Sequence, residues 1–223
     1  MQRPAYTAGM DHSLLPSWNR AWHGLAASGD GRAWFAQLLH CYVEPQRHYH
    51  TLQHLQECLT HFEHVRAAAA HPHEVEMALW FHDAIYEVRA ADNEQRSADW
   101  AREVLRGADV EAAAADRVHA LIMATRHTAI PSGQDEQLLI DIDLSILGAD
   151  AERFAEYEDQ IRREYAFVPG WLFKRKRRAI LSSFLDRPRL YSTALFHDAL
   201  EQRARANLSA AIAGRRVRAG ASA

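Results

Sequence analysis

The sequence predicts an all-α protein, built as a single-domain orthogonal bundle of helices. Apolar residues recur at intervals of three and four through most of the 223 residues, a pattern typical of helices with one buried face. No segment shows the strict alternation of apolar and polar residues that marks a half-buried strand. Hydrophobic residues make up 48% of the chain, enough for one core, and no linker or repeat indicates a second domain. We therefore expect one domain over residues 1–213 and a basic, flexible tail over residues 214–223.

Glycine and proline residues separate the expected helices at the start of the chain. Residues 16–27 and 31–42 are expected to form two helices on either side of the breaker SGDG. Pro45 ends the second, because proline cannot continue a helix.

The next three helices carry the residues of greatest chemical interest. Residues 52–70 are amphipathic, and Pro72 is well placed to open a helix over residues 73–86. Asp92 followed by Gln95 resembles a capping box, so a further helix is expected to begin there. The remaining expected helices are residues 112–127, 135–147, 151–165, 171–185 and 192–213.

The overall composition excludes several classes of protein. The formal net charge of −3 gives no reason to expect a nucleic-acid partner. The two cysteines form no CxxC pair and are expected to be free thiols in a reducing compartment. No apolar stretch reaches the roughly 18 residues that a membrane helix needs. We expect a soluble, cytoplasmic protein with no membrane partner, whose oligomeric state the sequence leaves open.

Several imidazoles and carboxylates fall among residues that look ready to form a core. His82 and Asp83 lie in the segment ALWFHDAIYEV, which is otherwise almost wholly apolar. Asp143 shares the apolar face of its helix, and His50 and His54 are four residues apart. A buried carboxylate costs several kcal/mol unless a cation or strong donors compensate it. These residues therefore indicate a metal site, and imidazoles with carboxylates suit Mn, Fe, Co, Ni, Zn or Mg.

A second His-Asp pair in LFHDALEQ, His197 with Asp198, provides a comparison within the same chain. A His-Asp dipeptide is common by chance, and this copy is interpreted as the solvated flank of a helix. The neighbouring segment EQRARAN, residues 201–207, is interpreted as a helix with structural ion pairs.

The whole pattern resembles the HD superfamily of metal-dependent phosphohydrolases, an all-helical family. Its signature is a histidine, an adjacent His-Asp pair and a distant aspartate on separate helices. The resemblance implies that His54, His82, Asp83 and Asp143 are the metal ligands. The motifs YHTLQH and DLS are similar to segments of the cyclic-nucleotide phosphodiesterases. The motifs YHTLQH, FHDAIY, DNEQRSA and DLSILG resemble an uncharacterised bacterial subgroup of predicted HD hydrolases.

The resemblance also implies a reaction, namely hydrolysis of a phosphoester by a metal-activated water with one or two divalent ions. The phosphodiesterase-like motif makes His50 the proton donor to the leaving group. Glu87, one position beyond where many HD enzymes carry an acid, is a candidate catalytic residue. Asn93 and Glu94 follow the His-Asp helix and are expected to line the mouth of the site.

Phosphate also needs positive charge, and KRKRR at residues 174–178 is the strongest basic run. Five consecutive residues of a helix cannot all point inward. Arg178 lies next to apolar positions and is the expected inward residue, with Arg162 as a second candidate for binding substrate. The expected partner is a small, nucleotide-like phosphoester.

Two other functions fit the same residues. Some HD-fold proteins resemble diiron oxygenases, which add further histidines, and here His119 and His127 would take that role. Alternatively, the protein is not catalytic, and the metal site braces the bundle or senses a nucleotide. A bracing site would be closed by protein ligands.

Overall fold

The computed structural model describes residues 12–214, and within this range it contains ten α-helices and no strand. The prediction of an all-α fold is therefore confirmed. The elements are η1 (His12–Leu14), α1 (Leu15–Gly24), α2 (Arg32–Tyr42), α3 (Leu52–Val65), η2 (Arg66–Ala68), α4 (Pro72–Phe81), α5 (Asn93–Gly107), α6 (Ala112–Ala124), α7 (Gln134–Asp143), η3 (Leu144–Gly148), α8 (Ala151–Glu164), α9 (Gly170–Leu185) and α10 (Ala194–Ile212).

Helix α4 is the centre of the first group of helices. Eight of its ten residues are buried, as expected for a helix that is apolar on almost every side. It packs against α1, α3, α5, α6 and α7. The buried Glu76 of α4 accepts hydrogen bonds from Arg20 and Ser17 of α1, so its charge is compensated.

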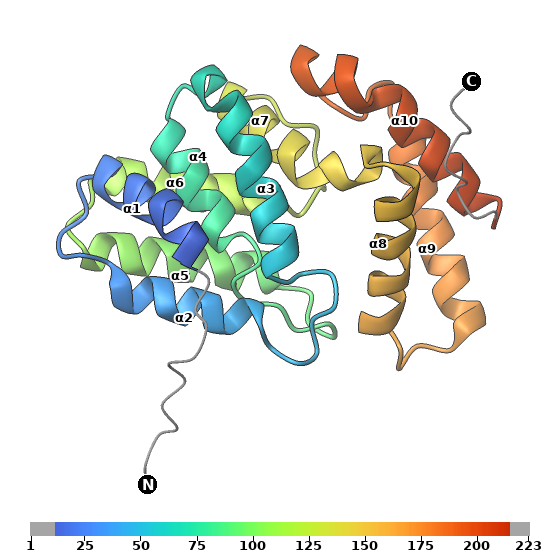
Figure 1. Cartoon of the computed structure of the whole chain (residues 1–223), viewed down its shortest axis with the longest axis horizontal. Helices are drawn as coiled ribbons and strands as arrows, with labels where there is room; N and C mark the ends of the chain where they lie inside the picture. Colours follow the sequence, from blue (N-terminus) through green and yellow to red (C-terminus); the bar gives the residue numbers. More distant parts are fainter. Residues whose placement is uncertain (1–11, 215–223) are drawn as a thin grey trace, which may run out of the picture.

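Helices α8, α9 and α10 form a second group beside the first (Figure 1). The short η3 element joins the two groups, because α8 and α10 both pack on it and α9 packs on α10. Asp141 of α7 is fully buried. Its carboxylate accepts hydrogen bonds from the backbone N–H groups of Ser192 and Thr193 at 2.8 and 2.7 Å, which anchors the start of α10 on α7.

Several helices, among them α4 and α7, end earlier than the apolar pattern predicts. Helix α4 was expected to continue to residue 86 but ends at Phe81, so the His-Asp pair lies at its C-terminal end. Arg47 causes part of this, because its guanidinium donates to the carbonyl oxygens of Asp83 and Ala84 at 2.6 and 2.9 Å. Helix α7 likewise stops at Asp143, where η3 begins.

Several smaller expectations can also be compared with the structure. Asp92 makes no side-chain capping bond, so the predicted capping box is wrong. Within residues 12–214, no helix combines the length and apolar character needed to cross a membrane. The C-terminal tail expected from residue 214 lies outside the described residues, apart from Gly214 in the turn after α10.

Candidate metal centre and cavity

Four of the predicted ligands meet where α3, α4 and α7 come together. The Nε2 atoms of His54 and His82 are 3.1 Å apart. Asp83 Oδ2 lies 3.0 Å from the Nε2 atom of His82 and 3.5 Å from that of His54. Asp143 Oδ1 lies 3.2 Å from His54 Nε2 and 3.7 Å from His82 Nε2. One nitrogen or oxygen atom of each side chain therefore faces a common point.

The hydrogen bonds of His82 fix which of its ring nitrogens faces that point. Its Nδ1 atom is 2.8 Å from the carbonyl oxygen of Leu79, which only accepts, so Nδ1 carries a proton and donates. In the neutral ring, Nε2 is then an acceptor that faces the carboxylates of Asp83 and Asp143. The cluster thus contains more acceptors than donors, and a cation fits such a set.

The pKa values of these groups also indicate that the cluster needs a positive charge to balance its carboxylates. Burial lowers the pKa of His82, but the Asp83 carboxylate outweighs burial and raises it to about 9. Burial raises the pKa of Asp83, but His82, His50 and His54 outweigh it and hold this pKa well below its ordinary value. The protein therefore keeps the carboxylates ionised, and either a proton on His82 or a metal ion balances their charge.

Cys58 is a neighbour of the cluster that the sequence placed only in the apolar stripe of its helix. A buried group of His54, Cys58, His82 and Asp143 could hold a metal ion, since one ligand atom from each lies within 4.8 Å of the others. The sulfur is 3.7 Å from Nδ1 and 3.8 Å from Nε2 of His54, whereas Asp83 Oδ2 is 3.5 Å from Nε2 of His54. Asp83, in contrast, places an oxygen close to both imidazole Nε2 atoms. Asp83 remains our predicted fourth ligand.

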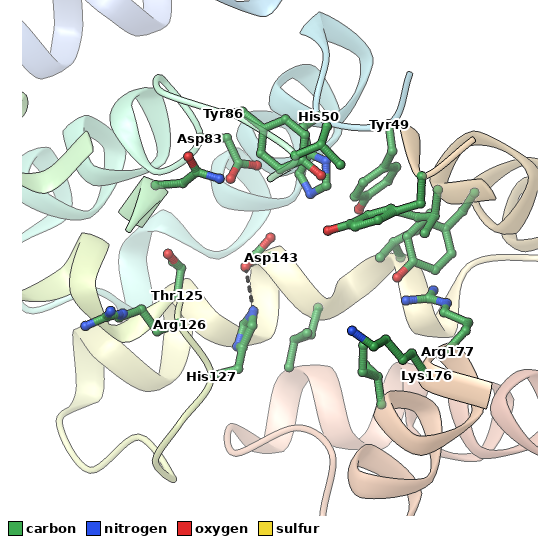
Figure 2. Close-up of a pocket in the computed structure, with 18 of the residues that line it drawn as sticks. Tyr49, His50, Asp83, Tyr86, Thr125, Arg126, His127, Asp143, Lys176 and Arg177 are labelled. Atoms are coloured by element: carbon green, nitrogen blue, oxygen red, sulfur yellow. Dashed lines mark hydrogen bonds and ion pairs between the residues drawn. The ribbon is translucent and has the colours of Figure 1, made fainter. Parts of the chain in front are cut away.

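A cavity of about 770 Å³ opens between the two groups of helices, and His50 and His127 are among the side chains that line it (Figure 2). Asp83 and Asp143 line it, whereas His54 and His82 lie behind them and are almost fully buried. The carboxylates are 17% and 13% exposed, so solvent and small molecules can reach them.

His50 lines the same cavity and is held in place by Glu164. Its Nδ1 atom lies 2.8 Å from Glu164 Oε2, and its ring stacks on Tyr86 with centroids 4.0 Å apart. Burial lowers the pKa of His50, but the carboxylates of Asp83 and Glu164 raise it above its ordinary value. His50 precedes α3 rather than sharing a helical face with His54, because Thr51 is the N-cap residue.

Glu164 is an important site residue that the sequence analysis missed. Its Oε1 atom accepts the backbone N–H groups of His48, Tyr49 and His50, and its Oε2 atom accepts the Tyr86 hydroxyl. A signal was present, because Glu164 continues the apolar stripe of α8 that contains Tyr157 and Ile161. The same reasoning that identified Asp143 would have found it.

His127 also lies beside the cluster, while the other histidine proposed for a diiron site does not. His127 Nε2 is 3.1 Å from Asp143 Oδ2, on the opposite side of that carboxylate from His54. Its backbone has a φ of 53°, which is uncommon for a residue other than glycine, and Arg187 donates to its carbonyl oxygen. His119 pairs with Asp99 at 3.1 Å and lines no part of the cavity.

Only some of the residues that were expected near the mouth of the site line the cavity. Asn93 and Glu94 line the cavity. Glu87 does not, because its side chain is 61% exposed and pairs with Arg96 at 2.9 Å. The structure therefore does not bring Glu87 into the cavity with the other candidate residues.

The two arginines that were expected to bind substrate, Arg178 and Arg162, do not line the cavity either. Arg178 is exposed and lies outside the cavity, since one step along a helix turns a side chain by about 100°. Lys176 and Arg177 line the cavity in its place. Arg162 donates to the carbonyl oxygens of Tyr165 and Val168 and thereby shapes the turn between α8 and α9.

The comparison His-Asp pair behaves as predicted. Asp198 is exposed, and His197 lies 3.3 Å from Glu201 on the same helix. Glu201 also pairs with Arg205 at 2.7 Å, as expected for a helix with structural ion pairs.

No family model, no curated protein and no solved structure matches this chain. The chemistry of the site therefore has to be argued from its own residues.

Proposed function

We propose that this protein is a metal-dependent phosphohydrolase of the HD type, which cleaves a small phosphoester. The main support is the convergence of two imidazole nitrogens and two carboxylate oxygens, 3.0 to 3.7 Å apart, beside an open cavity. These ligands suit Mn, Fe, Co, Ni, Zn or Mg, and the site holds one or two such ions.

His54, His82, Asp83 and Asp143 would hold the ion. A divalent cation there would lower the pKa of a bound water and stabilise negative charge on the phosphoryl oxygens. A water oxygen then forms the new bond to phosphorus, and the bond to the ester oxygen breaks with its electron pair.

His50 is the proton donor to the departing ester oxygen. Glu164 holds Nδ1 of His50, so the other ring nitrogen is available on the side of the cavity. The raised pKa of His50 favours the protonated form that an acid needs at neutral pH. For a phosphate monoester, the net reaction consumes one water and yields an alcohol and inorganic phosphate.

Positive charge for the phosphoryl group comes from two other elements. Lys176 of α9 and Arg126 after α6 both line the cavity. Among the described residues, neither side chain has an ion-pair partner, so both remain available to an anion.

The other two functions are less well supported. A diiron oxygenase would use His119, which lies elsewhere, although His127 is near enough to Asp143 to approach a second ion. A bracing metal would be enclosed by protein ligands, whereas both carboxylates face the cavity.

Metal analysis of the purified protein, followed by a phosphate-release screen over phosphoesters with each added metal, tests the proposal. We expect bound divalent metal and metal-dependent release of phosphate. Two irons with oxygen-dependent turnover would favour the oxygenase instead, and metal without any turnover would leave a bracing or sensing role.

A further inference from the structure

The wall of the cavity opposite the metal centre is predominantly apolar. Helices α8 and α9 and the turn between them contribute most of it, and η3 adds Leu144. The main apolar side chains of this wall are Ile161, Phe167, Val168, Phe173, Ile180 and Phe184. The cavity is far larger than a phosphate group alone requires.

Two residues of this wall are unusually exposed for their type. Phe167 is 49% and Ile180 is 48% exposed, and both line the cavity. Exposing a large apolar surface to water is unfavourable. A ligand that covers this surface gains about 25 cal/mol of free energy per Å² of apolar area removed from water. Apolar surface gathered beside a polar site is typical of ligand-binding clefts.

The polar groups near this wall are largely engaged with the protein itself. Arg177 is paired with Glu158, and Asn93 is bonded to the backbone of Glu87. Arg187 donates to the His127 carbonyl oxygen. Among the described residues of this wall, the side chains of Arg177 and Ser183 are therefore already bonded within the protein, whereas Lys176 has no ion-pair partner.

We propose that the substrate is a phosphate monoester of an apolar alcohol, whose apolar part lies against the wall formed by α8 and α9. This inference rests on the proposed function, because the phosphoryl group must lie at the metal centre. Water supplies the oxygen that bonds to phosphorus, and the apolar alcohol departs with the proton from His50. Lys176 lines the same cavity and supplies a cation for the phosphoryl group.

The test compares n-octyl phosphate with a primary hexose phosphate, using the metal-loaded protein. Both esters release a primary alcohol, so a difference in rate reports recognition of the alcohol rather than its departure. Each buried methylene contributes about 0.8 kcal/mol, so we expect kcat/KM for the octyl ester to be at least about tenfold higher. Phosphate release is the measurement.

Two variants test whether the preference for the apolar ester arises from the wall formed by α8 and α9. Ile180→Ala should raise KM for n-octyl phosphate by about threefold or more and leave the hexose ester unchanged, because it removes apolar contact area. Trp171→Ala is the matched control, since Trp171 is a 69% exposed apolar residue of the same helix that does not line the cavity. Trp171→Ala should leave KM unchanged for both esters.

The outcomes separate the two proposals. Equal kcat/KM for the two esters, or a preference for the hexose, would overturn the apolar substrate and leave the hydrolase standing. No phosphate release from either ester, or from a wider set of phosphoesters, would overturn the hydrolase and this inference with it.

Discussion

At the scale of single residues, the buried carboxylates of Asp83 and Asp143 are compensated by the imidazoles around them, and under the proposed function a divalent cation would complete this compensation. Changing His82 or Asp83 to alanine removes a ligand and leaves the remaining charges uncompensated. We expect purified His82→Ala and Asp83→Ala proteins to lose bound metal, with metal-dependent turnover falling by at least about 100-fold. Metal content by elemental analysis is the primary measurement, with circular dichroism to verify folding.

The second His-Asp pair supplies the control for this experiment. Asp198→Ala alters the same dipeptide motif at an exposed position and should keep full metal content. If the folded His82 and Asp83 variants retained as much metal as Asp198→Ala, the ligand assignment would be wrong.

Tyr49 provides a second test at this scale. It is 5% exposed and lines the cavity, yet its hydroxyl has no hydrogen-bond partner among the described residues. A buried hydroxyl without a partner costs about 1 to 3 kcal/mol, so a ligand that bonds to it would regain part of that cost.

We therefore expect Tyr49→Phe to leave stability unchanged or slightly higher and to raise KM for the phosphoester by about three- to tenfold. Thermal unfolding and steady-state phosphate release are the two measurements. A marked loss of stability would show that the hydroxyl has an internal structural role, contrary to this expectation.

At the scale of elements, all ten helices of the described region could be predicted, whereas the ends of several could not. The apolar spacing and the glycine and proline breakers located all ten helices of the described region. The premature end of α4 depends on Arg47, which is distant in sequence, so no local pattern around His82 could have indicated it. The convergence of the four candidate ligands could be anticipated because each is a charged or ionisable residue in an apolar setting.

The basic residues of α9 show why other site residues could not be predicted. The sequence does not say which neighbour covers each face of that helix, and the choice between Arg177 and Arg178 depends on this alone. Arg177 turns toward Glu158 and Tyr157, while Arg178 faces solvent.

Glu164 links two elements, helix α8 and the segment that precedes α3, and it makes their association sensitive to pH. Burial raises its pKa, but hydrogen bonds from His50 and the backbone lower it from 4.5 to about 2. Because this pKa is lowered in the folded protein, the ionised carboxylate stabilises the fold fully above pH 4.5. The stabilisation is lost as the pH falls toward 2 and the carboxylate is protonated. The pKa of His50 is raised in the folded protein, so protonated His50 stabilises the fold fully below pH 6.5. This stabilisation is lost as the pH rises through the raised pKa.

Both groups are therefore charged and stabilising between pH 4.5 and 6.5. We expect Glu164→Gln to lower the free energy of unfolding by roughly 2 to 3 kcal/mol in this window, with a difference that shrinks toward pH 2. Urea unfolding at several pH values is the measurement. Glu152→Gln, at an exposed position of the same helix, is the control, and an equal, pH-independent effect of the two variants would contradict the assignment.

At the scale of the whole molecule, the cavity exists because η3 fixes the second group of helices beside the first. Asn207 of α10 donates to the carbonyl oxygens of Leu147 and Ala149, on either side of Gly148. A Cβ atom at Gly148 would lie 2.7 Å from Leu200 Cβ and 2.9 Å from the Tyr191 hydroxyl. Only glycine lets α10 approach η3 this closely.

Gly148→Ala should consequently force α10 away from η3 and lower the free energy of unfolding by about 1 to 3 kcal/mol, the usual cost of overpacking. Gly107→Ala is the matched control, because a Cβ at this helical position meets no atom within 4 Å and alanine favours the helix. Urea unfolding of the two variants gives the comparison. If Gly148→Ala were as stable as Gly107→Ala, the contact between η3 and α10 would not set the position of the second group, and the shape of the cavity would have to depend on other contacts.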